Sequence, residues 1–258
     1  MKTLIKTTKS ILGVLTITLA LAVEAQAQSF LTNGLVAYYP FNGNANDASG
    51  NGYNGTAYNT TIVADYMGNP ASAYSLNGIN AYIYFGPILP DMQAMTVSAW
   101  VNPSNDSNFF VDADWAYGND LTIGISSVGT GIRCDKPPAP FETGYDFPLD
   151  VAIGESWNHL TWTLTTNSIR VYVNGVLVGS SGNRGGVDVG YHDFIIGTME
   201  LPQGNIGWAG YWKGDVCKLR IYNRALSDAE AQALYQHESQ PPPSSHRRPY
   251  GDQPARVP

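Results

Sequence analysis

The sequence predicts an all-β protein, an antiparallel β-sandwich of jelly-roll type with one short C-terminal helix. Three observations predict this fold class. Short runs of alternating apolar and polar residues recur along the chain, each bounded by Gly, Asn or Pro, which is typical of half-buried antiparallel strands. An Asn-Gly pair joins two of these runs, and one late stretch has apolar residues at helical spacing. Many strands followed by a single helix favour a sandwich.

The alternating runs place the strands. The clearest runs are residues 35–39, 81–85, 96–101 and 121–125. Residues 169–173 and 176–179 form the clearest hairpin, because the intervening Asn174-Gly175 accepts the two positive φ angles of a type I′ turn. No internal repeat at a fixed period is visible, so one domain is the simplest account.

The helix is expected over residues 226–237. Ser227-Asp228-Ala229-Glu230 has the pattern of a capping box, and the residues that recur at helical spacing are Leu226, Ala229, Ala233 and Leu234. From residue 238 the composition changes, and six of the last eighteen residues are proline. Because almost nothing apolar remains to bury, we expect residues 238–258 to be a disordered or extended Pro-rich tail.

The first 27 residues have the pattern of a secretory signal peptide. Three lysines precede an apolar run over residues 11–22, and Ala25-Gln26-Ala27 is a cleavage signal of the A-x-A type. The apolar run is too short to span a bilayer, which takes about 20 residues. We therefore predict a signal peptide at 1–27, a domain at 28–237, a secreted or cell-surface location and no membrane span after cleavage. An uncleaved membrane anchor is the alternative.

The charge balance excludes one class of partner. The formal net charge is −7, and it becomes −9 once three lysines and Glu24 leave with the predicted signal peptide. The body of the chain has no Lys/Arg cluster. We therefore expect no nucleic-acid partner, since such a partner needs a basic face.

The two cysteines, Cys134 and Cys217, leave two alternatives open. In an oxidising compartment they can form one disulfide that closes a long loop. The other alternative is a pair of buried free thiols. Two cysteines without C-x-x-C spacing do not indicate a zinc site.

Six segments occur in an order that is similar to a known family. They are residues 34–56, 73–78, 95–103, 157–164 (WNHLTWTL), 169–181 and 219–235 (LRIYNRALSDAEAQALY). In this order they resemble laminin-G-like, pentraxin-type domains of the concanavalin A-like lectin/glucanase superfamily. The resemblance covers residues 34–237 and implies two packed antiparallel sheets with the first and last strands side by side. It also implies binding of carbohydrate or another extracellular surface, and several domains of this type hold a structural calcium ion.

The loop at residues 41–56 is the candidate calcium site. Its segment 50–55 matches the pattern G-x-G-x-x-G, but no helix follows, so the pattern lacks the context that a dinucleotide site needs. Calcium binds carboxylate, amide and backbone carbonyl oxygens, which Asp47, Asn46, Ser49 and Asn51 offer. An Asx-turn loop without metal is the alternative.

The resemblance adds detail to this metal site. In related domains the Asp of the D-x-S-G-N segment takes part in the ion site, which corresponds to Asp47 and Asn51 here. Those relatives commonly carry acidic residues just before the Arg-Ile-Tyr-Asn-Arg segment, whereas this chain has Cys217-Lys218 there. Asp215 lies nearby and completes the predicted ligand set of Asp47, Asn51, Asn46 and Asp215.

Aromatic residues in turn-rich segments are the candidate carbohydrate contacts. Sugar rings present apolar C–H faces that stack on exposed Trp and Tyr side chains, and loops carry binding residues disproportionately. The predicted contacts are Trp115, Tyr117, Tyr145, Tyr191, Trp208 and Trp212. The alternative is that these rings pin down long loops. By contrast, we expect Trp100, Trp157 and Trp162 to be core residues.

A catalytic role is not favoured. The glucanases of the superfamily carry a tight cluster of carboxylates on one strand, and this sequence has no E-x-D-x-x-E or E-x-D-x-E motif. We therefore expect a non-catalytic module that binds carbohydrate or an extracellular surface. The first alternative is a polysaccharide hydrolase or lyase that uses groups such as Asp112, Asp114, His159 or Tyr145. The second alternative is a protein-binding adhesion or scaffold module.

Overall fold

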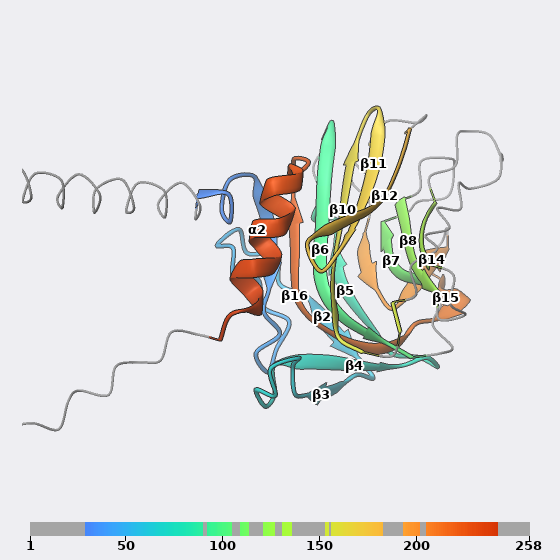
Figure 1. Ribbon diagram of the computed structural model, residues 1–258. Helices are drawn as coiled ribbons and strands as arrows, with labels where there is room; N and C mark the ends of the chain where they lie inside the picture. Colours follow the sequence, from blue (N-terminus) through green and yellow to red (C-terminus); the bar gives the residue numbers. More distant parts are fainter. Residues whose placement is uncertain are drawn as a thin grey trace, which may run out of the picture.

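The computed structural model describes residues 29–89, 92–104, 109–113, 121–126, 131–135, 153–154, 156–182, 193–201 and 205–241. These residues form two packed antiparallel sheets, with helix α2 (Asp228–Ser239) against the outer face of the larger sheet (Figure 1). The predicted fold class is therefore confirmed. The predicted signal peptide at 1–27 and the tail from residue 242 lie outside the described residues.

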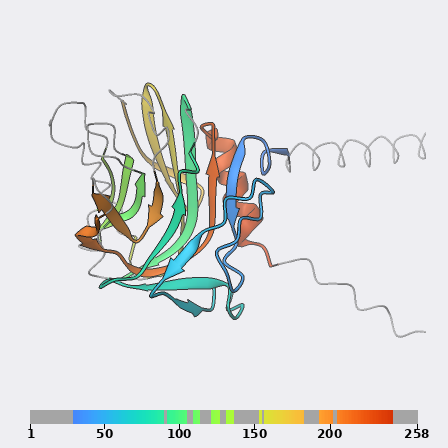
Figure 2. The ribbon, with the colours of Figure 1, turned by 180° about the vertical axis from the view of Figure 1, so that it is seen from behind.

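In the described residues, the larger sheet has eight strands. Their bounds are β1 Leu35–Tyr39, β3 Thr61–Val63, β4 Ala73–Asn77, β6 Ala94–Pro103, β10 Asn158–Thr165, β11 Ser168–Val173, β12 Val176–Gly182 and β16 Lys213–Tyr222. The strand order is β12-β11-β10-β6-β16-β4-β3, and β1 also pairs with β16. The first and last strands of the domain thus lie side by side, as the resemblance implies, and Figure 2 shows β1 (blue) beside the C-terminal half of β16.

The smaller sheet has six strands in the described residues. Their bounds are β2 Thr56–Tyr58, β5 Tyr82–Gly86, β7 Phe109–Ala113, β8 Leu121–Ser126, β9 Gly131–Asp135 and β13 Phe194–Ile196. The strand order is β2-β5-β13-β7-β8-β9, which leaves β2 at one edge. Strands β14 (Thr198–Leu201) and β15 (Asn205–Tyr211) form a separate two-stranded sheet.

The predicted hairpin between β11 and β12 is confirmed. Asn174 and Gly175 have φ angles of 51° and 76°, as a type I′ turn requires. A Cβ atom at Gly175 would lie 3.1 Å from the Cβ of Tyr235 in α2. The tip of the hairpin therefore touches the helix, and glycine is needed there for both the turn and the contact.

The core lies between the two sheets. Along β10, Leu160, Trp162 and Leu164 face it, and from the smaller sheet Ile83 and Phe110 meet them. Burying a large apolar side chain of this kind stabilises a fold by about 1.5–3 kcal/mol. The prediction that Trp162 is a core residue is confirmed, since its exposed fraction is 0%.

The predicted capping box of the helix is confirmed, but the C-terminal boundary is wrong. Ser227 Oγ accepts the N–H of Glu230 at 3.3 Å, and the Glu230 carboxylate accepts the N–H of Ser227 at 2.8 Å. The helix then continues past the predicted end at residue 237 to Ser239. Glu238, which the sequence assigns to the tail, is 2% exposed. Glu238 is buried because it packs against the larger sheet, where its partners Trp100 and Arg220 lie.

Candidate functional site

The outer face of the larger sheet is divided into a covered part and an open cleft. Along β6, the core residues are Met95, Val97, Ala99 and Val101. Because side chains alternate along a strand, Ser98, Trp100 and Asn102 point outward. Helix α2 covers Trp100, whose indole donates a hydrogen bond to Glu238 of the helix. Asn102 lies in the open cleft.

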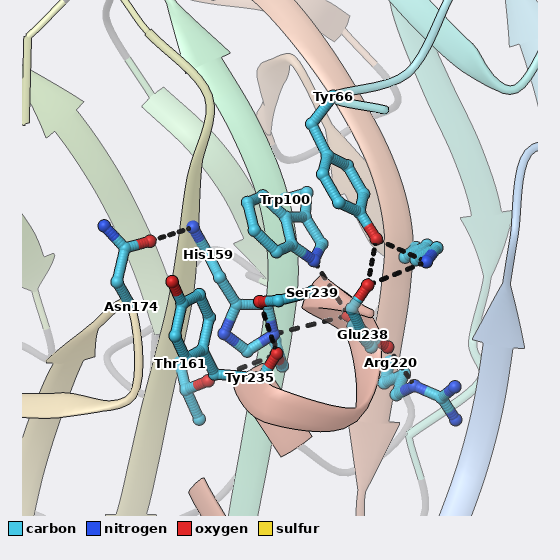
Figure 3. A network of polar contacts seen from close by, with 11 residues as sticks. Tyr66, Trp100, His159, Thr161, Asn174, Arg220, Tyr235, Glu238 and Ser239 are labelled. Carbon is cyan, nitrogen blue, oxygen red and sulfur yellow. Dashed lines mark hydrogen bonds and ion pairs between the residues drawn. The ribbon is translucent and has the colours of Figure 1, made fainter. Parts of the chain in front are cut away.

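In the covered part, three strands of the larger sheet hold the carboxylate of Glu238 (Figure 3). Arg220 of β16 donates from Nε to Oε1 at 2.7 Å, and Trp100 of β6 donates from Nε1 to Oε2 at 3.1 Å. Nε2 of His159 in β10 lies 3.4 Å from Oε2. Since the side chains of His159 and Glu238 are 0% and 2% exposed, this buried ion network joins the helix to the sheet.

The charge state of the network follows from these contacts. Burial alone raises the pKa of Glu238, but the hydrogen bond from His159 and the charge of Arg220 outweigh it and lower the pKa to about 2. Burial alone lowers the pKa of Arg220, and the charge of Glu238 outweighs that effect and raises it. Both side chains are therefore ionised at neutral pH and compensate one another.

The network extends to the segment between β3 and β4. The ring of Tyr66 stacks on Trp100, with centroids 3.7 Å apart and planes at 4°. Its hydroxyl donates to the backbone oxygen of Glu238 and accepts from Nζ of Lys218. The network thus anchors the last turn of the helix. His159, which the enzyme alternative names as a candidate catalytic group, is packed and hydrogen-bonded within this network, and its full burial keeps it from a substrate.

An open cleft of about 550 Å³ lies where β4, β16 and β6 run side by side. It is lined by Ser75, Leu76, Asn77, Asn102, Pro103, Ser104, Lys213, Gly214 and Asp215. The sheet register explains how they meet. Asp215 pairs with Ser75 on one side and with Asn102 on the other, and Lys213 pairs with Asn77. Polar residues from three strands therefore form two adjacent rows.

Hydrogen bonds fix the polar groups of the cleft. Asn102 donates from Nδ2 to Oδ2 of Asp215 at 3.1 Å, and Ser104 donates from Oγ to the carbonyl oxygen of Lys213 at 3.2 Å. At the rim, Oδ1 of Asn77 accepts the N–H groups of residues 79–81. These hydrogen bonds hold the side chains in place, which reduces the ordering cost of binding.

Glycine is required at position 214, within the cleft. A Cβ atom there would lie 2.6 Å from the carbonyl oxygen of Asn102 and 2.7 Å from the ring of Trp212. Strand β16 can therefore pass close to this ring only without a side chain at 214. The backbone of the cleft at Gly214 thus lies directly against the core.

The arrangement suits a ligand rich in hydroxyl groups. Asp215 and Asn102 offer carboxylate and amide oxygens as acceptors, while the Asn77 amide and the Lys213 ammonium can donate. Asn77 and Lys213 are exposed, and Asp215 and Asn102 are half-buried. Among the described residues that line the cleft, Asp215 is the one carboxylate, whereas glycoside hydrolysis uses a pair of carboxyl groups.

The loop predicted to bind calcium is organised by hydrogen bonds to Asp47. Its Oδ1 accepts the N–H groups of Tyr38 at 3.0 Å and Ser49 at 2.8 Å. Its Oδ2 accepts the Ser49 hydroxyl at 2.8 Å and the N–H of Tyr53 at 3.2 Å. Burial raises the pKa of Asp47, but these hydrogen bonds outweigh it and lower the pKa. The carboxylate thus ties the loop to β1, and its bond to Ser49 has the form of an Asx-turn.

The structure does not bring the four predicted calcium ligands together. Asn51 donates its side-chain amide to the carbonyl oxygen of Val36 at 2.8 Å, and the N–H of Asn46 is bonded within the loop. Asp215 lies instead in the cleft, bonded to Asn102. In the part of the chain that the structure describes, no three His, Cys, Asp or Glu side chains form a metal-binding group. Calcium binding stays a prediction.

The prediction that Trp212 contacts carbohydrate is wrong. Its side chain is 0% exposed and packs edge-on against Phe110, with ring centroids 5.0 Å apart. The glycines around it suggest a turn, whereas residues 205–211 form β15 and residue 213 begins β16. Trp208 likewise lies in a strand, β15. The other four, Trp115, Tyr117, Tyr145 and Tyr191, lie outside the described residues.

Two further predictions concern single side chains. Cys217 is a buried free thiol, so the disulfide alternative is wrong for this residue. Burial raises the pKa of this thiol, which keeps it uncharged and unreactive. Asp112 lies in β7 of the smaller sheet, and Asp114 lies outside the described residues.

Sequence reasoning missed the cleft, although part of its signal is visible. In residues 73–78 (AYSLNG), the alternation of side chains puts Ser75 and Asn77 on the same face of a strand. In residues 95–103 (MTVSAWVNP), it puts Asn102 on the face opposite the core residue Val101. The pattern does not say which strands are neighbours. Only the register of β16 between β4 and β6 places Asp215 beside both.

These observations define a class of protein, an antiparallel β-sandwich domain of the lectin type with a polar cleft on one outer face. The chain belongs to the concanavalin A-like lectin/glucanases superfamily, because a laminin-G family model with that description matches residues 77–232. The resemblance seen in the sequence is therefore confirmed. No curated protein matches the chain in sequence.

Several solved structures share the fold. Domain 4 of AbnA, a GH43 extracellular arabinanase from Geobacillus stearothermophilus, in complex with arabinotriose, is 25% identical with a TM-score of 0.62, over 78% of this chain and 98% of that chain. The binding domain of Paraclostridial Mosquitocidal Protein 1 is 19% identical with a TM-score of 0.63, and the match covers 81% of this chain and 53% of that chain. The botulinum neurotoxin serotype D ligand binding domain in complex with N-acetylneuraminic acid is 15% identical with a TM-score of 0.63, and the match covers 82% of this chain and 53% of that chain. The chain spans about half the length of these two toxin domains, and their likeness shows the fold alone.

Across the residues that the structure describes, none of the helices combines the length and the apolar character needed to cross a membrane.

Proposed function

We propose that the protein is a secreted, non-catalytic module that binds carbohydrate in the cleft between β4, β16 and β6. The observation that carries the proposal is the pair of polar rows in register, with Asp215 fixed against Asn102 at 3.1 Å. Sugar hydroxyl groups both donate and accept hydrogen bonds, so they can pair with the acceptors and donors of these rows. Among the described lining residues Asp215 is the one carboxylate, which supports binding over glycoside hydrolysis, a reaction that uses two carboxyl groups.

The comparisons support an oligosaccharide as the ligand class. The AbnA domain was solved with arabinotriose, and the match extends over 98% of that domain. Arabinotriose is therefore the first probe for this protein. Secretion is supported by the signal-peptide pattern at residues 1–27. Mass spectrometry of the exported protein should find Gln28 at the N-terminus, and an intact N-terminal segment would contradict secretion by cleavage.

Calorimetric titration with arabinotriose, together with a glycan array, tests the proposal. The informative variants are Asp215→Asn and Asn102→Ala. Asn167→Ala is the matched control, because it removes an exposed amide from the turn between β10 and β11. A hydrogen bond to a charged group contributes about 1.5–3 kcal/mol, so Asp215→Asn should weaken binding by about tenfold or more. The control should bind like the wild type.

Two results would overturn the proposal. One is a folded wild-type protein that binds no glycan on the array and no arabinotriose. The other is glycan binding that neither Asp215→Asn nor Asn102→Ala weakens, which would remove the cleft as the site.

A further inference from the structure

An aromatic pair lies on the outer face of the smaller sheet. Tyr58 in the edge strand β2 is the cross-strand partner of Tyr82 in β5, and their rings stack with centroids 4.6 Å apart and planes at 17°. Ile83 and Phe85 belong to the core, so Tyr82 and Tyr84 point away from it. Tyr58 is 41% exposed. The pair therefore presents aromatic surface to solvent at the edge of the sheet.

Polar groups border this aromatic surface. Tyr84, two residues beyond Tyr82 on the same face, donates its hydroxyl to Oδ2 of Asp193 at 2.8 Å. A carboxylate offers about four lone-pair directions, so Asp193 can accept further hydrogen bonds from a ligand. Asn59 donates from Nδ2 to the carbonyl oxygen of Asn80 at 3.0 Å, which fixes the end of β2 next to the segment that leads into β5.

Cross-strand packing accounts for only part of this arrangement. Stacking of two rings on neighbouring strands stabilises a sheet by about 0.2–1 kcal/mol, and it does not require the polar groups that Tyr84 and Asp193 add further along β5. An oligosaccharide has parts that match both features, because its sugar rings offer an apolar C–H face for stacking and hydroxyl groups at the rim. The stacked tyrosines match the apolar face, and Asp193 can accept hydrogen bonds from hydroxyl groups.

We propose that Tyr58 and Tyr82 form a second carbohydrate site that stacks one neutral sugar ring, with Tyr84, further along β5, and Asp193 to bind hydroxyl groups of the adjoining sugar. This site rests on the proposed function, since it gives the same class of ligand a second surface. The tyrosines lie on the outer face of the smaller sheet, and the cleft lies on the outer face of the larger one. Residues 78–81 connect Asn77 of the cleft to Tyr82.

Two sites on one domain make the protein bivalent. A polysaccharide that reaches both sites binds the second one at high effective concentration, so its apparent affinity exceeds that of a short oligosaccharide. Arabinan, the polymer of the sugar in arabinotriose, should therefore bind more tightly than arabinotriose. Loss of either site should remove this difference.

Titrations of the full chain with arabinotriose and with arabinan test the second site. Tyr58→Thr removes the ring and introduces a β-branched residue, which also favours a strand conformation. Tyr53→Thr is the matched control, since Tyr53 is 38% exposed and lies in the loop before β2. Tyr58→Phe retains the stacking surface without the hydroxyl. Thermal unfolding of each variant confirms that it is folded.

The expected results separate the two sites. Wild type should take up about two trisaccharides per chain, and Tyr58→Thr and Asp215→Asn should each take up about one. Tyr58→Thr should weaken arabinan binding about tenfold, while Tyr53→Thr and Tyr58→Phe should bind like the wild type.

Three results would overturn the second site. If Tyr58→Thr titrates like the wild type while Asp215→Asn removes all binding, the tyrosine pair is not a site and the proposed function stands. If Tyr53→Thr or Tyr58→Phe loses as much binding as Tyr58→Thr, stacking on the pair is not the cause. If the wild type binds neither probe nor any glycan on the array, the proposed function and the second site fail together.

Discussion

Replacing Glu238 with Gln should destabilise the domain, because Glu238 is the buried counter-charge of Arg220. Gln is nearly the same size and can still accept a hydrogen bond, so the substitution removes the charge and leaves the packing. Arg220 would then keep a guanidinium whose side chain is 9% exposed, without the carboxylate that lies 2.7 Å from its Nε. A buried charge without a partner is costly.

The contacts give the magnitude in two ways. Breaking one partner of a buried ion pair costs about 3–5 kcal/mol. The pKa of Glu238 lies at about 2 instead of 4.5, and at 1.36 kcal/mol per pKa unit this difference corresponds to about 3 kcal/mol of stability at neutral pH. In a domain of this size, about 3 kcal/mol lowers the melting temperature by about 6–12 °C.

Urea denaturation followed by tryptophan fluorescence measures the free energy of unfolding, and thermal denaturation measures the midpoint. Gln236→Ala is the control, since it changes an exposed side chain in the same turn of α2 and should cost less than about 0.5 kcal/mol. Arg220→Met should destabilise the domain as well, and the double variant should lose less than the sum of the two single losses. A loss below about 1 kcal/mol for Glu238→Gln would refute the reasoning, because the network would then contribute no more than a surface ion pair.

Four more predictions follow from the same structure. Because the folded-state pKa of Glu238 is lowered, its stabilising contribution is present above pH 4.5 and is lost as the pH falls toward about 2. The wild-type midpoint should thus drop across this window more steeply than that of Glu238→Gln, and parallel curves would contradict this. Trp212→Ala should lower the free energy of unfolding by about 3–5 kcal/mol, because the ring is fully buried. Trp212→Phe should lower it less and keep glycan binding in titrations. Loss of binding by this folded variant would contradict a purely structural role. In a Cys134→Ser variant, maleimide should label Cys217 only after unfolding, since the thiol is buried; rapid labelling of the native protein would be the opposite result. Asp47→Ala should lower the thermal midpoint by several degrees even in chelator, because four hydrogen bonds to the loop are lost. For the wild type, a midpoint that rises when calcium is added would support the calcium prediction, and an unchanged midpoint would reject it.

The parts of the fold that the sequence predicts correctly are those encoded by neighbouring residues. The turn at Asn174-Gly175 depends on two positive φ angles, and the start of α2 depends on Ser227 and Glu230, three positions apart. Alternation along a strand is equally local, which is why the core side of β10 can be read from Leu160 and Trp162. Hydrogen bonds of this short range form within one turn or one strand, so the chemistry of the residues suffices to predict them.

The predictions that fail depend on how distant strands meet. Trp212 looks exposed in a glycine-rich segment, but it packs against Phe110 of the smaller sheet, within the core. Glu238 looks like the start of a polar tail, but the larger sheet places Trp100, 138 positions away, within hydrogen-bonding distance. Neither side chain carries a local signal of its burial, because burial is a property of the packed sheets and helix.

The sequence by itself thus determines the strands, the hairpin, the helix cap, the family and the acidic character of this protein. The tertiary structure alone decides which polar groups share a surface. Asn102 and Asp215 lie 113 positions apart and meet through the register of β6 and β16, and a shift of one residue would turn one of them toward the core. Because side chains alternate with a period of two, register decides whether a polar residue lines a cleft or faces the core, and register is set by pairing across the whole sheet.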